Sequence, residues 1–183
     1  MKTLPLYHDV RDKLRTGDVL LCSGVDYVAW KIRKVTSSPY SHVAAVRVDL
    51  NRVMAFEAAA DGTGYLPVSL LARRKYEHIA VYRLRRASAG QFQPYEFLAS
   101  LLDELGLEYG FATLGLIWFR ERLAITVPAK DDATLDTRIC SEYVSVAFRR
   151  AGIDPCPAKP DKYTYPRDFE RSSLFKEVAK FRF

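Results

Sequence analysis

The sequence predicts an α+β fold in which a mostly antiparallel sheet packs against helices. Strand-like runs at residues 42–48, 53–59 and 79–84 follow one another before the main helical segments begin. Strands that alternate with helices would instead indicate a parallel sheet. The chain has 183 residues, of which 49% are hydrophobic and 27% are charged. This length and composition fit a single domain, residues 1–183, with a full hydrophobic core.

The first half of the chain predicts one helix among the strands. A short buried strand runs from Val19 to Cys22, after a Gly-Asp pair. Apolar residues then recur at helical spacing across residues 25–36, which predicts a helix with one apolar face. Those apolar positions are Val25, Val28, Ala29, Ile32 and Val35. The next strand begins at His42, and residues 49–52 form the turn that leads to its neighbour.

The second half of the chain predicts helices. Residues 94–105 begin with proline, which is favoured in a first helical turn, and a glycine follows them. Residues 111–119 are apolar and fit either a helix or a strand, and residues 126–137 are polar and loop-like. An amphipathic helix then covers residues 140–150 and ends before a glycine at position 152.

The charge of the chain does not identify a partner. The formal net charge of +6 permits contact with an anionic cell-wall polymer, a phospholipid or a nucleic acid. Clusters at residues 73–75 and 83–86 are interpreted as solvated faces, and no nucleic-acid partner is expected because no nucleic-acid-binding motif accompanies them. The apolar run at 111–119 is too short to cross a bilayer, so no transmembrane segment is expected. No signal peptide is recognised, which predicts a cytoplasmic protein, with later release or export left open.

Neither a cofactor nor a metal is expected. Pairs and clusters of Cys, His and carboxylates at metal-ligand spacing are absent from the sequence, as are the G-x-S-x-G motif and a phosphate-cradling glycine loop. The three cysteines, Cys22, Cys140 and Cys156, do not make a disulfide framework.

Cys140 and His42 are the candidate nucleophile and base. Cys140 lies in the first turn of its predicted helix, where the partial positive charge of the helix end favours a thiolate. His42 begins a strand, and a tight turn at Leu50-Asn51 would place Ala44 opposite Glu57 on the next strand. His42 and Glu57 then share one face of the sheet as diagonal neighbours, so the carboxylate can orient the imidazole.

Each of these residues also has a purely structural interpretation. A cysteine on an amphipathic helix is usually a small buried hydrophobe, and a strand histidine is usually satisfied by core contacts. Glu57 could face solvent. Cys22 belongs to an apolar strand and Cys156 to a proline-flanked turn, so both are weaker candidates for chemistry than Cys140.

Four short motifs lie in order between about residues 14 and 175. They are Gly17-Asp18-Val19-Leu20-Leu21, Thr36-Ser37-Ser38-Pro39-Tyr40-Ser41-His42-Val43, Phe56-Glu57-Ala58 and Cys140-Ser141-Glu142-Tyr143-Val144. Their order and spacing resemble the circularly permuted NlpC/P60 family, a papain-like group of the YiiX/YebB type with poxvirus relatives. Residues 166–169, followed by 172–175, resemble the closing segment of that group.

The resemblance implies a permuted papain-like fold in which the histidine precedes the cysteine. It implies Cys140 as nucleophile, His42 as base and Glu57 as the third polar residue, with Asp18 shaping the core or a turn. Substrate binding is assigned to Tyr40, Ser41 and Ser141. Residues 107–136 precede the nucleophile, where a lid or a substrate wall would form.

The expected function is a papain-like thiol hydrolase, a cysteine peptidase or amidase, that cleaves an amide bond through an acyl-enzyme. A cell-wall peptide is the leading substrate. One alternative is a hydrolase or transferase for lipid or ester acyl groups, and another is a non-catalytic papain-like binding module of phage or viral type. The oligomeric state is left open.

Overall fold

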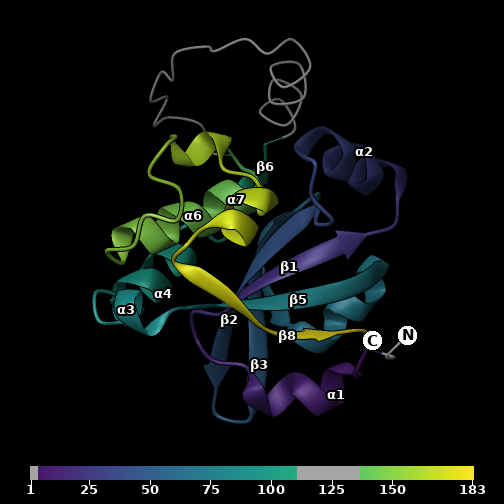
Figure 1. The fold of residues 1–183 in the computed structure, drawn as a ribbon, viewed down its shortest axis with the longest axis horizontal. Coiled ribbons are helices and arrows are strands. Elements are labelled where there is room, and N and C mark those ends of the chain that lie inside the picture. Colours follow the sequence, from purple (N-terminus) through teal and green to yellow (C-terminus); the bar gives the residue numbers. More distant parts are fainter. Residues whose placement is uncertain (1–3, 111–136) are drawn as a thin grey trace.

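The structure is a computed structural model, and it describes residues 4–110 and 137–183. Its centre is a six-stranded antiparallel sheet with the strand order β4-β3-β2-β1-β5-β8 (Figure 1). These strands are β1 (Val19–Gly24), β2 (His42–Asp49), β3 (Arg52–Ala59), β4 (Gly62–Pro67), β5 (Tyr76–Leu84) and β8 (Phe175–Phe181). The predicted α+β class with a mostly antiparallel sheet is confirmed for the described residues.

Helices lie on both sides of the sheet (Figure 1). They are α1 (Tyr7–Val10), α2 (Tyr27–Thr36), α3 (Arg86–Ala89), α4 (Pro94–Asp103), α6 (Cys140–Arg150) and α7 (Pro166–Arg171). Short 3-10 turns are η1 (Arg11–Lys13), η2 (Val68–Arg74) and η3 (Asp161–Tyr163), and β6 (Glu108–Tyr109) pairs in parallel with β7 (Thr137–Arg138). The expectations for residues 111–119, and for nearly all of 126–137, fall on residues outside the described part.

The two faces of the sheet have separate cores because side chains alternate between faces along each strand. Val43 and Ala45 of β2 pack with Phe97 of α4, Val144 of α6 and Phe169 of α7. The neighbouring positions of β2 face the other way. Ala44 and Val46 pack there with Val10, Leu14, Val68 and Leu71, which come from α1, the segment after η1, and η2.

The hairpin of β2 and β3 has the predicted register. Ala44 pairs with Glu57, and Asp49 pairs with Arg52 across a two-residue turn. Leu50 in that turn has a φ of 51°, the left-handed conformation that such tight turns require. A shift of one residue would move the apolar side chains of one strand to the other face of the sheet. The turn and the buried face therefore specify this register together.

Two edge strands were not predicted from the sequence. Strand β4 is rich in glycine, and β8 mixes charged with apolar residues, without strict alternation, after a proline-containing tail. Both are stabilised by pairing with an inner strand, β4 with β3 and β8 with β5. Helix α2 begins two residues later than predicted and leaves Val25 and Val28 more than half exposed, so its predicted apolar face is only partly covered.

The buried carboxylate of Asp18 forms an ion pair with the partly exposed Arg83 of β5. The Arg83 Nε donates to Asp18 Oδ1 at 2.7 Å, and Asp18 also accepts from the backbone N–H of Arg15 at 2.8 Å. Asp18 therefore shapes a turn and the core, as the resemblance implied. The interpretation of residues 83–86 as a purely solvated basic face is wrong for Arg83, because its guanidinium is committed to this carboxylate.

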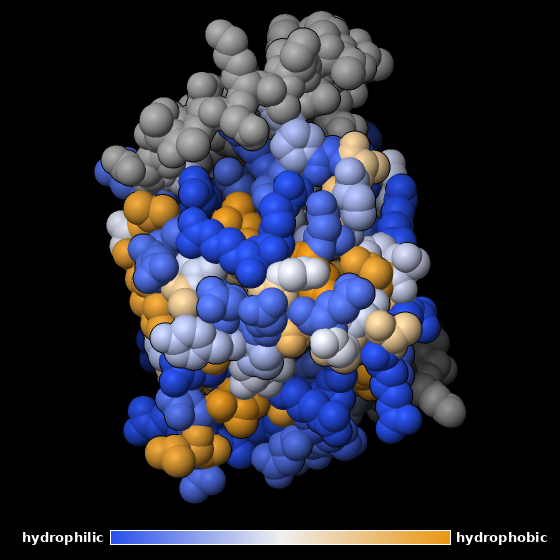
Figure 2. All heavy atoms as spheres, turned by 90° about the vertical axis from the view of Figure 1, so that its left-hand side faces the viewer, coloured by the Kyte–Doolittle hydropathy of each residue, from blue (hydrophilic) through white to orange (hydrophobic). Residues whose placement is uncertain are grey.

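The surface on the side of α3 and α4 is largely hydrophilic, with apolar residues in separate patches (Figure 2). Among the described residues, every helix is too short or too polar to span a lipid bilayer.

Candidate active site

Helix α6 places Cys140 in its first turn. The Glu142 carboxylate accepts the backbone N–H of Ile139 at 3.5 Å and so caps the helix start. The face opposite to solvent carries the apolar stripe predicted from the sequence, and all of it is buried. Its members are Tyr143, Val144, Ala147 and Phe148. The Tyr143 hydroxyl donates to the carbonyl of Leu101 at 2.5 Å, which ties α6 to α4. This packing holds the start of the helix against the sheet.

His42 and Glu57 are joined by a hydrogen bond, as the hairpin register predicted. The distance from His42 Nε2 to Glu57 Oε2 is 2.8 Å, and the side chains are 12% and 2% exposed. This bond occupies Nε2, so Nδ1 is the ring nitrogen left for another partner. Because side chains alternate between faces along a strand, His42 and Glu57 both lie on the face of the sheet that η2 covers. Cys140 instead belongs to the helical layer on the opposite face. The three groups therefore meet at the end of the sheet where β2 begins.

Cys140 and His42 form a buried, mutually charged pair. Burial raises the pKa of the Cys140 thiol. The charge and hydrogen bond of His42 lower it, and so do hydrogen bonds from the backbone N–H groups of Val43 and Ser141. These effects outweigh burial, so the pKa lies below the ordinary value. Burial lowers the pKa of His42, but the Cys140 sulfur and Glu57 together raise it to about 10. Between the lowered pKa of Cys140 and about pH 10, the favoured state is consequently a thiolate beside an imidazolium.

The other two cysteines behave differently. Cys22, which pairs with His42 across β1 and β2, is fully buried, and burial raises its pKa well above the ordinary value. Burial also raises the pKa of Cys156, which is partly exposed in a turn. Of the three thiols, Cys140 alone has a lowered pKa, which sets it apart as the nucleophilic candidate.

Arg74 is part of this cluster, and sequence reasoning missed it. Its guanidinium donates to Glu57 Oε1 at 3.0 Å and to Asp61 at 3.3 Å. Burial raises the pKa of Glu57, but the hydrogen bond and charge of His42 and the charge of Arg74 outweigh it and keep the carboxyl ionised. The prediction that residues 73–75 form a purely solvated cluster is therefore wrong for Arg74. Its sequence position within a basic run gave no sign of a carboxylate partner 17 residues away.

Tyr76 covers one face of the histidine. Its ring stacks on His42 with centroids 6.1 Å apart and an interplanar angle of 15°. This contact restricts the tilt of the imidazole, while Glu57 fixes its rotation. A ring held in both directions can keep Nδ1 directed at the thiol of Cys140.

The three residues assigned to substrate binding are buried. Tyr40 lies in the core edge-on to Tyr82. Ser41 Oγ accepts the backbone N–H of Gly24 at 3.0 Å, and Ser141 Oγ donates to the carbonyl of Thr164. These hydroxyl groups hold the surroundings of the Cys140, His42 and Glu57 cluster together, and their assignment to substrate binding stays a prediction.

Comparison with known proteins supports the fold. No family model and no curated protein sequence matches the chain. A solved structure that is similar is that of the metalloprotein yiiX from Escherichia coli O157:H7, DUF1105. The two structures superpose with a TM-score of 0.69 over 92% of this chain and 98% of the other, at 18% sequence identity. At that identity the match shows a shared fold.

The neighbour is described as a metalloprotein. Residues 4–110 and 137–183 contain no group of three or more His, Cys, Asp and Glu side chains placed to hold a metal ion. His42 and Glu57 are bonded to each other, and the second oxygen of Glu57 accepts from Arg74. A guanidinium at this carboxylate does not fit a cation bound to the same group.

Proposed function

We propose that this protein is a thiol hydrolase that cleaves an amide bond through an acyl-enzyme formed on Cys140. The pairing of Cys140 with His42 is the observation that carries the proposal, because it lowers the pKa of one thiol of three. The hydrogen bond from His42 to Glu57 supports the same assignment, since a base oriented by a third group is typical of activated nucleophiles.

In the proposed reaction the Cys140 thiolate attacks the carbonyl carbon of the substrate. The negative charge that develops on the carbonyl oxygen is stabilised by the backbone N–H of Cys140, one of the free donors at the start of α6. The His42 imidazolium donates its Nδ1 proton to the leaving amine as the carbon–nitrogen bond breaks. A water molecule then gives a proton to His42 and attacks the thioester, which releases the acid and regenerates the thiolate.

Glu57 and Arg74 would act through His42. The Glu57 carboxylate holds the imidazole through Nε2 and stabilises its charged form, and Arg74 keeps that carboxylate ionised. The order His42, Glu57, Cys140 and the similarity of the fold to yiiX support placing the chain in the circularly permuted NlpC/P60 type. Within that type we propose a peptide amide of the cell wall as the substrate.

Turnover of defined substrates tests the proposal. The purified protein is incubated with soluble cell-wall peptides and, separately, with phospholipid vesicles, and the products are identified by mass spectrometry. We expect a new amine and a new carboxylic acid from the peptide, together with an acyl adduct on the peptide that contains Cys140. The variant Cys140→Ala should abolish both signals, whereas Cys156→Ala should retain them.

The other outcomes are distinguishable. Release of fatty acid from the vesicles by the Cys140-dependent route would replace the amide by an acyl ester as the substrate class. A Cys140 thiol that reacts rapidly with iodoacetamide but turns over neither substrate would favour a binding module that retains the cluster. A thiol that is no more reactive than Cys156 would contradict the hydrolase itself.

A further inference from the structure

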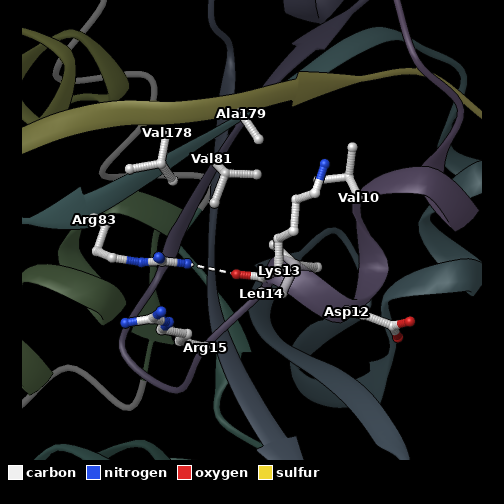
Figure 3. A pocket seen from close by; sticks show the side chains of 9 residues that line it. All are labelled: Val10, Asp12, Lys13, Leu14, Arg15, Val81, Arg83, Val178 and Ala179. Atoms are coloured by element: carbon white, nitrogen blue, oxygen red, sulfur yellow. Dashed lines mark hydrogen bonds between the residues drawn. The ribbon is translucent and has the colours of Figure 1, made fainter.

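Two adjoining cavities lie at the edge of the sheet formed by β5 and β8. The larger, of about 390 Å³, is bounded by the segment from α1 to β1 on one side and by β8 on the other (Figure 3). Its apolar lining residues are Val10, Leu14, Val81, Val178 and Ala179. The second cavity, of about 300 Å³, extends toward α3 and shares Arg15, Arg83 and Val178 with the first. The two adjoining cavities are together called the edge groove here.

The walls of the edge groove are strongly basic. Five cationic side chains line it: Lys13, Arg15, Arg83, Arg86 and Lys176. Two acidic residues also line it, and both are already paired. Asp12 accepts from Arg11 at 3.0 Å, and Asp18 is 1% exposed and pairs with Arg83. Within the described residues, the other four cations of the groove have no acidic partner, so the groove carries a concentrated and uncompensated positive charge.

Arg83 is held in place at the junction of the two cavities. Its Nε and one terminal nitrogen contact the two oxygens of Asp18 at 2.7 and 2.8 Å, and that same nitrogen donates to the backbone carbonyl of Lys13 at 2.7 Å (Figure 3). The side chain is nevertheless 23% exposed. The guanidinium is therefore fixed in advance, and a ligand that meets its free edge need not pay the entropy of ordering it.

The sheet pairing places a like charge directly opposite this arginine. Lys176 of β8 is the register partner of Arg83 of β5, and like charges in such cross-strand positions destabilise a sheet. Arg15 lies beside Arg83 in the same groove (Figure 3). Packing of the sheet does not require these cations to converge, whereas an anion placed among them would remove the repulsion.

We propose that the edge groove binds a phosphate-bearing anion, with Arg15, Arg83 and Lys176 as its ligands. Guanidinium groups match the oxygens of phosphate in geometry, and the ammonium of a lysine adds a compact charge. The apolar lining suits the carbon portion of a phosphate ester. This site lies at the opposite end of β5 from Tyr76, which stacks on His42, so its occupancy is separate from the chemistry proposed at Cys140.

Thermal unfolding of the full chain tests the site. The melting temperature is measured with sodium phosphate, with sodium pyrophosphate and with sodium chloride at matched ionic strength. An anion present at 100 times its Kd should raise the melting temperature by roughly 5–10 °C for a domain of this size. Lys176→Glu should lose this increase without loss of folding, because it replaces a like-charge pair with an opposite-charge pair. Arg15→Glu should lose it as well.

A matched control separates the groove from the general basic surface. Lys34→Glu makes the same change in net charge on exposed α2 and should keep the full response to phosphate. Co-sedimentation with phosphatidylglycerol and phosphatidylcholine vesicles identifies the source of the phosphate. Stabilisation by the free anions indicates a soluble phosphate compound, and Lys176-dependent binding to phosphatidylglycerol vesicles alone indicates a lipid headgroup. The proposal is overturned if the parent responds to neither, or if Lys176→Glu responds as the parent does.

Discussion

Replacing His42 by alanine should move the alkylation of Cys140 to higher pH. In the parent the thiolate exists above the lowered pKa of Cys140, and the imidazolium partner persists up to about pH 10. The rate of reaction with iodoacetamide should therefore reach its plateau at a lower pH than that of an ordinary thiol. Without His42 the largest remaining influence on the thiol is its burial, which raises the pKa. The alkylation midpoint should then lie at or above the ordinary thiol value of about 8.5.

The expected size of the effect follows from the thiolate fraction. At pH 6 a thiol with a pKa of about 8.5 is only about 0.3% ionised, and the lower pKa that His42 gives to Cys140 makes its thiolate fraction larger. The paired thiolate is less basic, and a Brønsted coefficient of about 0.4–0.5 offsets roughly half of the gain in thiolate fraction on a logarithmic scale. At a pH below both pKa values, we therefore expect His42→Ala to alkylate Cys140 about three- to fourfold more slowly for each unit by which the substitution raises the pKa of the thiol.

Peptide mapping by mass spectrometry measures this rate at each cysteine separately. Cys156 in the same sample is the internal control, since its pKa is raised and His42 is absent from the causes of that shift. Its rate should be equal in the parent and in His42→Ala. An alkylation midpoint for Cys140 near 8.5 or higher in the parent, unchanged by the substitution, would refute the ion pair.

Three further predictions concern carboxylates. Glu57→Gln keeps a hydrogen-bonding group beside His42 but removes its charge, and should raise the midpoint of Cys140 alkylation by about one pH unit. The lowered pKa of Glu57 contributes stability that is present above the ordinary pKa of about 4.3 and is lost as the pH falls through the pKa of the folded state. Urea titrations should therefore show that Glu57→Gln loses less stability than the parent between pH 5 and pH 3. Asp18→Asn should cost about 3 kcal/mol of unfolding free energy by urea denaturation, because it leaves a guanidinium unpaired, whereas Asp12→Asn on the surface should be nearly neutral.

Local patterns carried enough information to predict the hairpin and its register. The alternation of apolar residues in 42–48 and 53–59 and the short polar turn between them leave one register that buries a complete face. That register placed Glu57 beside His42, and the structure has the two side chains 2.8 Å apart. The start of α6 at Cys140 was predictable for the same reason, because amphipathic periodicity begins there and ends before a glycine.

Long-range partners were not predictable in this way. Arg74 belongs to a basic run that reads as a solvated surface, and only the position of η2 beside β3 brings its guanidinium to Glu57. The edge strands β4 and β8 lack a continuous apolar pattern, since an edge strand is stabilised by its paired neighbour rather than by its own hydrophobic residues. Lys176 was therefore not recognised as the partner of Arg83.

By itself, the sequence determined the class of the fold, the register of one hairpin and the positions of Cys140, His42 and Glu57 within their helix and strands, because each depends on periodicity within a short segment. The tertiary structure decided that a helix from one side of the sheet meets a histidine from the other at the end of β2. It also decided the electrostatics, since pKa shifts depend on burial and on charges that lie far apart in the chain. Cys140 and Cys22 are both buried, and the neighbouring imidazole lowers the pKa of Cys140 alone.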